Sequence, residues 1–148
     1  MLRNEKGVGL VEVMVALLVL LIVFVGLLQA ALLSIDNNTR NVLRDEAINI
    51  AAARMEELRN STFTSLASDT GSISGADCPS AFTTGFLQQR AVRNIPSKDF
   101  CERLTCTEFG GDNNCATDDS DTKQLRIDVG WRWKGENYTH SLTTVRRR

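Results

Sequence analysis

The hydrophobic pattern is strongest near the N-terminus, where positions 13–35 form an uncharged run of 23 residues between Glu12 and Asp36. A helix rises about 1.5 Å per residue, so the run spans about 34 Å and can cross a bilayer core of about 30 Å. A cleaved secretory signal has a shorter apolar region and a small-residue cleavage site, and the sequence around Ala30 fits such a site poorly. The pattern therefore predicts a membrane-spanning helix rather than a cleaved secretory signal.

Beyond Asp36 the chain becomes polar but keeps a helical period. One apolar face recurs at spacings of four, four, four and three residues, and it consists of Leu43, Ala47, Ala51, Met55 and Leu58. We expect one continuous helix from Val8 to Arg59, with a membrane-spanning first half and an amphipathic second half. The second half should cover the sheet of a globular head.

The C-terminal part of the chain alternates with the period of a strand. Every second residue from Leu125 to Trp133 is apolar, and this face consists of Leu125, Ile127, Val129, Trp131 and Trp133. Residues 134–137 predict a turn, and Tyr138–Val145 predicts the second strand of a hairpin. The expected fold class is α+β, with a long N-terminal helix packed against a small antiparallel sheet.

The middle of the chain is less regular. Residues 60–85 are rich in Ser, Thr and Gly and predict a long connector that Cys78 tethers. Residues 86–95 are compatible with a strand or a helix, of which we favour a strand that Pro96 ends. We expect the following segment, residues 99–109, to be short and to contain disulfides. Residues 110–123 predict a loop. Its aspartates do not follow the order of a calcium-binding EF-hand and therefore favour a solvated turn; they are Asp112, Asp118, Asp119 and Asp121.

Length and charge limit the possibilities further. A chain of 148 residues allows one domain besides the membrane helix. If the helix takes about 60 residues, about 85–90 remain for the head, few enough for cross-links to matter. The formal net charge of −1 gives no sign of a nucleic-acid-binding surface, and the basic residues 146–148 predict a solvated tail.

Four cysteines fall in the predicted head: Cys78, Cys101, Cys106 and Cys115. Arg3 and Lys6 precede the apolar run, which predicts a cytoplasmic N-terminus and an exported head. Disulfides are the default in an oxidising compartment, and zinc is disfavoured because the spacing contains no CxxC and His140 is the sole histidine. Of the three possible pairings we prefer Cys78 with Cys101 and Cys106 with Cys115.

The sequence offers no set of residues for catalysis. Nucleophilic catalysis needs a base beside the nucleophile, and His140 lies in an alternating strand with no motif around it. We therefore expect no enzyme, no catalytic residues, no cofactor and no metal.

The first 35 residues resemble the leader and helix of type IV prepilins. The leader MLRNEKG is short and basic and ends at Gly7, Val8 would be the first mature residue, and Glu12 falls fifth in the mature chain. The run EVMVALLVLLIVFVGLLQ is similar to the helices of PilV-like minor pilins and of type II secretion pseudopilins of the I class. Two positions depart from the usual pattern: Val8 replaces phenylalanine, and Gln29 replaces the helix-kinking proline of many major pilins. The second departure favours a minor subunit.

The resemblance implies cleavage between Gly7 and Val8 by a prepilin peptidase, and N-methylation of Val8. The new α-amino group has a reference pKa of about 7.7–8.0, so it would be largely cationic and would compensate Glu12 in the same helix or on a neighbouring subunit. Pairing across subunits would set the register between helices, because a charge in an apolar bundle tolerates few positions. The alternative for Glu12 is a carboxylate that only lies at the membrane interface.

The resemblance further implies a structural function, as a minor pilin that waits in the inner membrane and then enters a type IV pilus, priming or capping it. Its head would be periplasmic before assembly and extracellular afterwards. The expected partners are other major and minor pilins, the prepilin peptidase and membrane lipid, with no nucleic acid. Two alternatives stay open: a minor pseudopilin of a type II secretion system, and a membrane-anchored exported binding or adhesin module.

We expect a leader at 1–7, the transmembrane and assembly half of the helix at 8–35, its amphipathic half at 36–60 and the head at 61–148.

Overall fold

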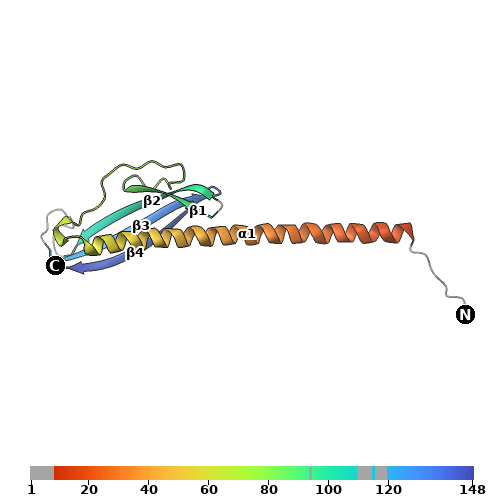
Figure 1. Ribbon diagram of the computed structural model, residues 1–148, viewed down its shortest axis with the longest axis horizontal. Coiled ribbons are helices and arrows are strands. Elements are labelled where there is room, and N and C mark those ends of the chain that lie inside the picture. Colours follow the sequence, from red (N-terminus) through yellow and green to blue (C-terminus); the bar gives the residue numbers. More distant parts are fainter. Residues whose placement is uncertain (1–8, 94, 110–114, 116–119) are drawn as a thin grey trace, which may run out of the picture. The chain divides into compact units, whose positions relative to one another are not determined.

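The computed structural model describes residues 9–93, 95–109, 115 and 120–148. Its elements are, in chain order, α1 (Leu10–Asn60), the short 3-10 helix η1 (Phe63–Ser65), β1 (Phe86–Val92), β2 (Ile95–Glu108), β3 (Thr122–Trp133) and β4 (Glu136–Arg147). The chain divides into two compact units, Met1–Thr39 and Arg40–Arg148. The second, which we call the head unit, contains the C-terminal part of α1 and the four strands (Figure 1).

Helix α1 is continuous over 51 residues, as its periodicity predicts. Gly26 lies within the helix without interrupting it. The helix ends at Asn60, one residue beyond the predicted end, while the predicted start at Val8 lies outside the described residues.

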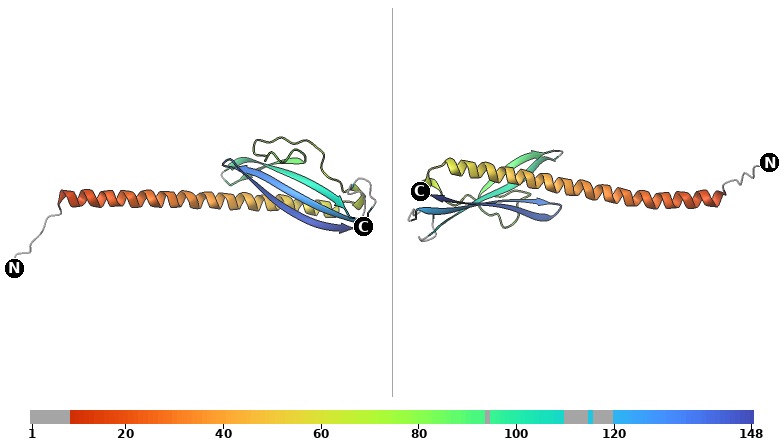
Figure 2. Two further views of the ribbon diagram at one scale, coloured as in Figure 1. Left: turned by 180° about the vertical axis from the view of Figure 1, so that it is seen from behind. Right: turned by 90° about the horizontal axis from the view of Figure 1, so that it is seen from below.

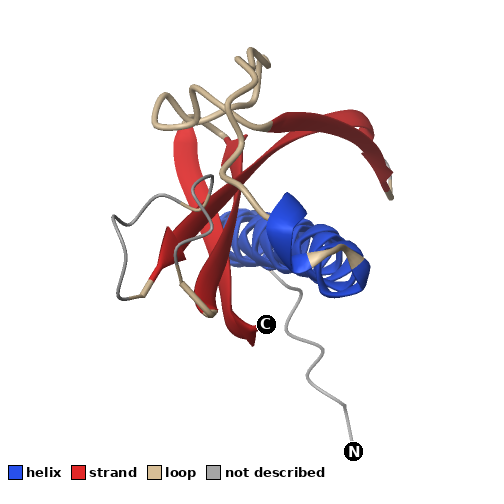
Figure 3. Ribbon diagram, turned by 90° about the vertical axis from the view of Figure 1, so that its left-hand side faces the viewer, coloured by secondary structure: helices blue, strands red, loops and turns tan. Residues whose placement is uncertain are grey.

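In the head unit, residues 40–60 of α1 cover one face of an antiparallel sheet with the strand order β1-β2-β3-β4. Figures 2 and 3 show the sheet curving around one side of this part of the helix. The predicted apolar face of the helix is confirmed, because all five of its residues are buried. They share one core with the alternating face of β3, of which Leu125, Ile127, Val129 and Trp131 are buried and Trp133 is half-buried. The expected α+β, pilin-like arrangement is therefore present.

The C-terminal hairpin is tighter and longer than predicted. Trp133 pairs with Glu136, so the turn consists of Lys134 and Gly135 alone. Both have positive φ, 49° and 84°, and two such residues suffice to reverse the chain between twisted strands. The prediction of a four-residue turn was wrong at Glu136 and Asn137, which belong to β4.

The first hairpin corrects the interpretation of Pro96. Residues 86–92 form a strand as predicted, but Pro96 does not end it, because it is the second residue of β2. The chain already turns at Arg93, whose φ is 50°, and Ile95 then pairs with Val92. Proline lacks an N–H, and it is tolerated here because it lies at the beginning of a strand, where the pairing with β1 is irregular.

Strand β2 was also underestimated. Residues 99–109 were expected to be a short segment, yet residues up to Glu108 belong to a strand of 14 residues that pairs with both β1 and β3. The strand shows no simple alternation because several of its polar residues are buried, namely Lys98, Asp99, Glu102 and Glu108. Each of them needs a partner from another part of the head unit.

The connector covers the edge of β2 that β1 leaves open. The N–H of Leu104 donates to the Asp69 carboxylate at 2.7 Å, and the N–H of Cys106 donates to Ser68 Oγ at 2.9 Å. The N–H of Asp69 in turn donates to the Leu104 carbonyl at 3.0 Å. These bonds satisfy backbone groups that a further strand would otherwise satisfy.

Two disulfides join distant parts of the head unit. Cys78 is bonded to Cys101, with Cα atoms 5.6 Å apart, and Cys106 to Cys115, with Cα atoms 5.9 Å apart. This is the pairing that we preferred from the sequence. The first bond tethers the connector to β2, as expected for Cys78.

The C-terminal arginines do not form the solvated tail that was predicted. Arg146 lies in β4, and its Nη1 donates to the Leu58 carbonyl oxygen at 2.7 Å. A cation is favourable at this position because the carbonyl groups at a helix C-terminus carry partial negative charge. The N–H of Arg148 donates to the Asp121 carbonyl oxygen at 3.0 Å.

Candidate functional site

The predicted assembly residue, Glu12, lies in the first turn of α1. Its backbone N–H donates to the Gly9 carbonyl oxygen at 2.9 Å, and the N–H of Val13 donates to the same oxygen at 3.3 Å. Both N–H groups belong to the beginning of the helix, where partial positive charge stabilises a nearby carboxylate.

The apolar side chains of the first unit are uncovered. The most apolar 18-residue window of α1 has a mean hydropathy of 3.1, and none of it is buried. The large apolar residues between Leu10 and Ile35 are 47% to 77% exposed. Within the described part of the chain, α1 is the one helix long and apolar enough to cross a membrane. Such a surface needs a bilayer or neighbouring apolar helices to cover it.

The side chain of Glu12 borders a shallow apolar groove on the helix, with Val13, Ala16, Leu17 and Leu20. Ala16 and Leu20 follow Glu12 at intervals of four residues and therefore lie on the same helix face. Among residues 9–93, 95–109, 115 and 120–148, no hydrogen-bond or ion-pair partner reaches the Glu12 carboxylate. The predicted processing residues, Gly7 and Val8, lie outside the described residues.

The head unit contains a charged cluster around Arg54 that the sequence analysis missed. Its guanidinium lies 2.7 Å from Glu57, 3.1 Å from Glu102 and 3.8 Å from Asp69. Burial raises the pKa of Glu102 above its ordinary value, and the attraction of Arg54 only partly offsets this. Burial opposes the charged form of Arg54 too, but the hydrogen bond to Glu57 and the neighbouring carboxylates outweigh it and raise the pKa of Arg54. Only the pair Arg54 and Glu57, three residues apart on one helix, was visible in the sequence.

A second buried carboxylate, Asp128, lies on the face of β3 that points away from its apolar residues. It accepts hydrogen bonds from Ser141 at 2.5 Å, Arg126 at 2.9 Å and Arg103 at 3.2 Å. Burial alone would raise the pKa of Asp128, but these hydrogen bonds outweigh it and hold the pKa below its ordinary value. The cluster links β2, β3 and β4.

The other candidate residues from the sequence are dispersed. His140 lies on β4, opposite Val129. Of the loop aspartates, Asp121 lies 3.8 Å from the Arg148 guanidinium, while the other three lie outside the described residues. In the part of the chain that the structure describes, no group of three or more His, Cys, Asp or Glu side chains is arranged to hold a metal ion.

Comparison with known families agrees with the N-terminal pattern. The family model of the prokaryotic N-terminal methylation motif matches residues 2–28, which include Gly7, Val8 and Glu12. Searches of curated proteins and of solved structures returned no match. The motif supports a type IV pilin-type or pseudopilin protein that a prepilin peptidase processes, a class that is structural rather than enzymatic, and it fits an inner-membrane anchor. The chain thus carries the N-terminal methylation motif of type IV pilin-like proteins at the start of an uncovered apolar helix.

Proposed function

We propose that this chain is a minor pilin of a type IV pilus. It is inserted in the inner membrane by α1, loses residues 1–7 to the prepilin peptidase, and joins other major and minor pilins in a filament that it primes or caps. The observation that carries the proposal is Glu12, a carboxylate with no partner among the described residues, at the beginning of a helix whose apolar surface is uncovered.

A neighbouring pilin subunit supplies what both features need. Its apolar helix covers the exposed side chains, and its N-terminal amino group, which cleavage after Gly7 creates, is a cation that pairs with Glu12. Either charge alone is costly in an apolar bundle, so the ion pair favours one axial register between the helices.

The proposal divides the chain by task. Residues 1–7 are the leader, residues 8–35 span the membrane and later mediate assembly, residues 36–60 are the amphipathic half of the helix, and residues 61–148 form the exported head. The head is periplasmic before assembly and extracellular in the pilus. Gln29 in place of a proline supports a minor rather than a major subunit.

Substitution of Glu12 tests the assembly role. Glu12→Val should leave membrane insertion and cleavage intact, since it removes a charge from an apolar segment and retains the leader. Breaking a buried ion pair costs about 3–5 kcal/mol, so recovery with partner pilins should fall by about 100-fold or more. Glu12→Asp should be intermediate, because the shorter side chain keeps the charge but loses reach. Cross-linking and co-purification of the mature protein from its native host provide the measurement.

The matched control is Glu56→Val, which removes the same charge from an exposed position of α1 in the head unit. This variant should assemble like the wild type. If Glu12→Val also assembles at the wild-type level, Glu12 is an interfacial carboxylate with no part in docking.

Mass spectrometry of the protein from its native host tests the processing step. We expect an N-methylated Val8 terminus in the wild type and in Glu12→Val. Gly7→Val should remain uncleaved if the peptidase needs close approach to the backbone at this position. An intact Met1 terminus, or a cut near Ala31, would contradict the proposal.

A type II secretion pseudopilin carries the same kind of N-terminal motif. The partners recovered by cross-linking separate the two functions, because a minor pilin should yield pilus subunits and a pseudopilin should yield secretion components. The genes beside this one provide an independent check.

A further inference from the structure

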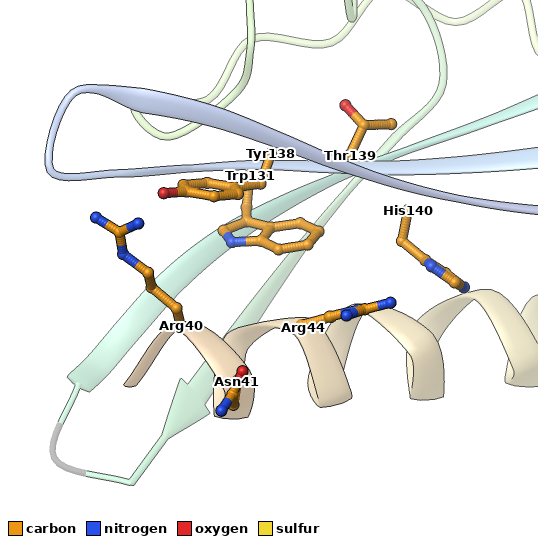
Figure 4. A pocket seen from close by; sticks show the side chains of 7 residues that line it. All are labelled: Arg40, Asn41, Arg44, Trp131, Tyr138, Thr139 and His140. Atoms are coloured by element: carbon orange, nitrogen blue, oxygen red, sulfur yellow. The ribbon is translucent and has the colours of Figure 1, made fainter. Parts of the chain in front are cut away.

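A groove of about 340 Å³ lies in the head unit between α1 and the β3–β4 hairpin. Figure 4 shows the side chains that line it: Arg40, Asn41 and Arg44 come from α1, and Trp131, Tyr138 and His140 come from the hairpin. The groove therefore combines an aromatic wall with several groups that can donate hydrogen bonds.

The aromatic wall is a cross-strand pair. Trp131 and Tyr138 are register partners, and their rings stack with centroids 5.7 Å apart and an interplanar angle of 17°. The Arg40 guanidinium lies 5.8 Å from the centre of the Tyr138 ring and 3.6 Å from Glu136. The Tyr138 hydroxyl also donates to Glu136. These contacts hold Arg40 and the ring in place before any ligand binds.

The positive charge of the groove is only partly compensated. Arg44 is exposed, His140 is half-buried, and neither has a hydrogen-bond or ion-pair partner among the described residues. Figure 4 shows the Arg44 side chain extending towards His140. No acidic residue occurs among the described residues that line the groove. A guanidinium fork beside an imidazole is a set of donors that suits phosphate oxygens.

The chain brings this groove close to the membrane. Arg40 follows Ile35, the last residue of the uncharged run, by five residues, which span at most about 18 Å even when fully extended. The headgroup layer begins directly outside the bilayer core, so Arg40 lies within reach of it. Tyr and Trp are enriched at this interface, and Arg attracts anionic lipids there.

We propose that the groove binds the headgroup of an anionic phospholipid. Arg44 and His140 donate to the phosphate oxygens, and Tyr138, which stacks on the buried Trp131, contacts the less polar part of the lipid next to the headgroup. The proposal requires that α1 spans the membrane, but it does not require that the chain is a pilus subunit. Failure of the Glu12 experiments would therefore leave it standing.

Native mass spectrometry of the full chain in detergent micelles tests the proposal. Phosphatidylglycerol is added in one series and phosphatidylcholine with the same acyl chains in another. We expect one phosphatidylglycerol molecule to bind at least about fivefold more tightly than phosphatidylcholine. Arg44→Gln should lose this preference, and His140→Gln should reduce it. Neither residue has a partner in the described part of the head unit, so both variants should keep the near-ultraviolet circular dichroism of the wild type.

The matched control is Arg59→Gln, which removes the same charge from an exposed position of α1 away from the groove. It should keep the full preference for phosphatidylglycerol. An equal loss in Arg44→Gln and Arg59→Gln would assign the preference to overall charge and overturn the proposal. Equal binding of the two lipids would also overturn it. Displacement of phosphatidylglycerol by equimolar soluble glycerol 3-phosphate would identify a soluble phosphate compound as the ligand instead of a lipid.

Discussion

The ammonium group of Lys123 lies 3.4 Å from Oε1 of Glu108, and both side chains are fully buried. The same ammonium donates to the carbonyl oxygens of Phe63 at 3.3 Å and Cys115 at 3.0 Å. Lys123 thereby joins the beginning of β3 to η1 and to the segment that the Cys106–Cys115 disulfide closes. The Glu108 oxygens accept no hydrogen bond from the described residues, so Lys123 supplies their compensating charge.

Removal of the lysine charge should therefore destabilise the head unit. Lys123→Met leaves the Glu108 carboxylate buried without a cation and should lower the free energy of unfolding by about 3–5 kcal/mol. The double variant Lys123→Met/Glu108→Leu should recover part of this loss, because no charge remains buried. Denaturant unfolding of the full chain in detergent micelles, monitored by the near-ultraviolet circular dichroism of the tryptophans, measures the stability of both variants. Equal losses in the single and double variants would refute the pairing.

Asp128 should make stability depend on acid pH. Its pKa in the folded protein lies below the ordinary value of 3.8, so its contribution is present above that pH and is lost as the pH falls through the folded pKa. Asp128→Asn should lower the free energy of unfolding by about 1.5–3 kcal/mol at pH 7, because hydrogen bonds to a charged group are lost. The gap between wild type and variant should close as the pH falls below 3.8, which unfolding titrations at several pH values will measure.

The pKa of Glu102 is shifted in the opposite direction, so its contribution to stability should depend on pH in the opposite way. Its pKa in the folded protein lies above the ordinary value of 4.5, so its contribution is present below that pH and is lost as the pH rises through the folded pKa. The stability of the wild type relative to Glu102→Gln should therefore fall as the pH rises from 4.5. If the difference in unfolding free energy between wild type and variant does not change with pH for Asp128→Asn or for Glu102→Gln, both pKa shifts would be contradicted.

The two disulfides should differ in their contribution to stability. The Cys78–Cys101 bond spans 23 residues and the Cys106–Cys115 bond spans 9. Chain entropy predicts losses of about 3.4 and about 2.6 kcal/mol when each pair is replaced by serine, because the longer loop gains more freedom in the unfolded state. Unfolding of the two double-serine variants in parallel tests this order, and a larger loss for Cys106–Cys115 would contradict the entropic explanation.

Alanine substitutions at Gly85 and Gly135 distinguish the cost of a steric clash from the cost of backbone strain. Both have positive φ, 130° and 84°. A Cβ atom at Gly85 would collide with the backbone of Glu102 and Arg103, whereas one at Gly135 would meet no atom within 4 Å. Gly135→Ala should cost about 1–2 kcal/mol from strain alone, and Gly85→Ala should cost more. Thermal or denaturant unfolding will rank the two, and equal losses would show that the clash at Gly85 relaxes without cost.

The regular elements followed from short-range periodicity. Burial of one face sorts residues with a period of 3.6 in a helix and 2 in a strand, so Leu43, Met55, Ile127 and Val129 already marked faces that meet in the core. The same reasoning failed for β2, because buried Glu102 and its polar neighbours obscure the alternation and their partners lie far away in the chain.

By itself the sequence determined the apolar helix, the position of Glu12 at its beginning and the alternating face of β3. Each of these depends on residues that are neighbours in the chain. Only the tertiary structure decided that Arg54 meets Glu102, that Arg146 reaches Leu58, and that Arg44 and His140 line one groove. Such contacts depend on strand register and on how the sheet packs against α1, and both are set by the packing of the whole core.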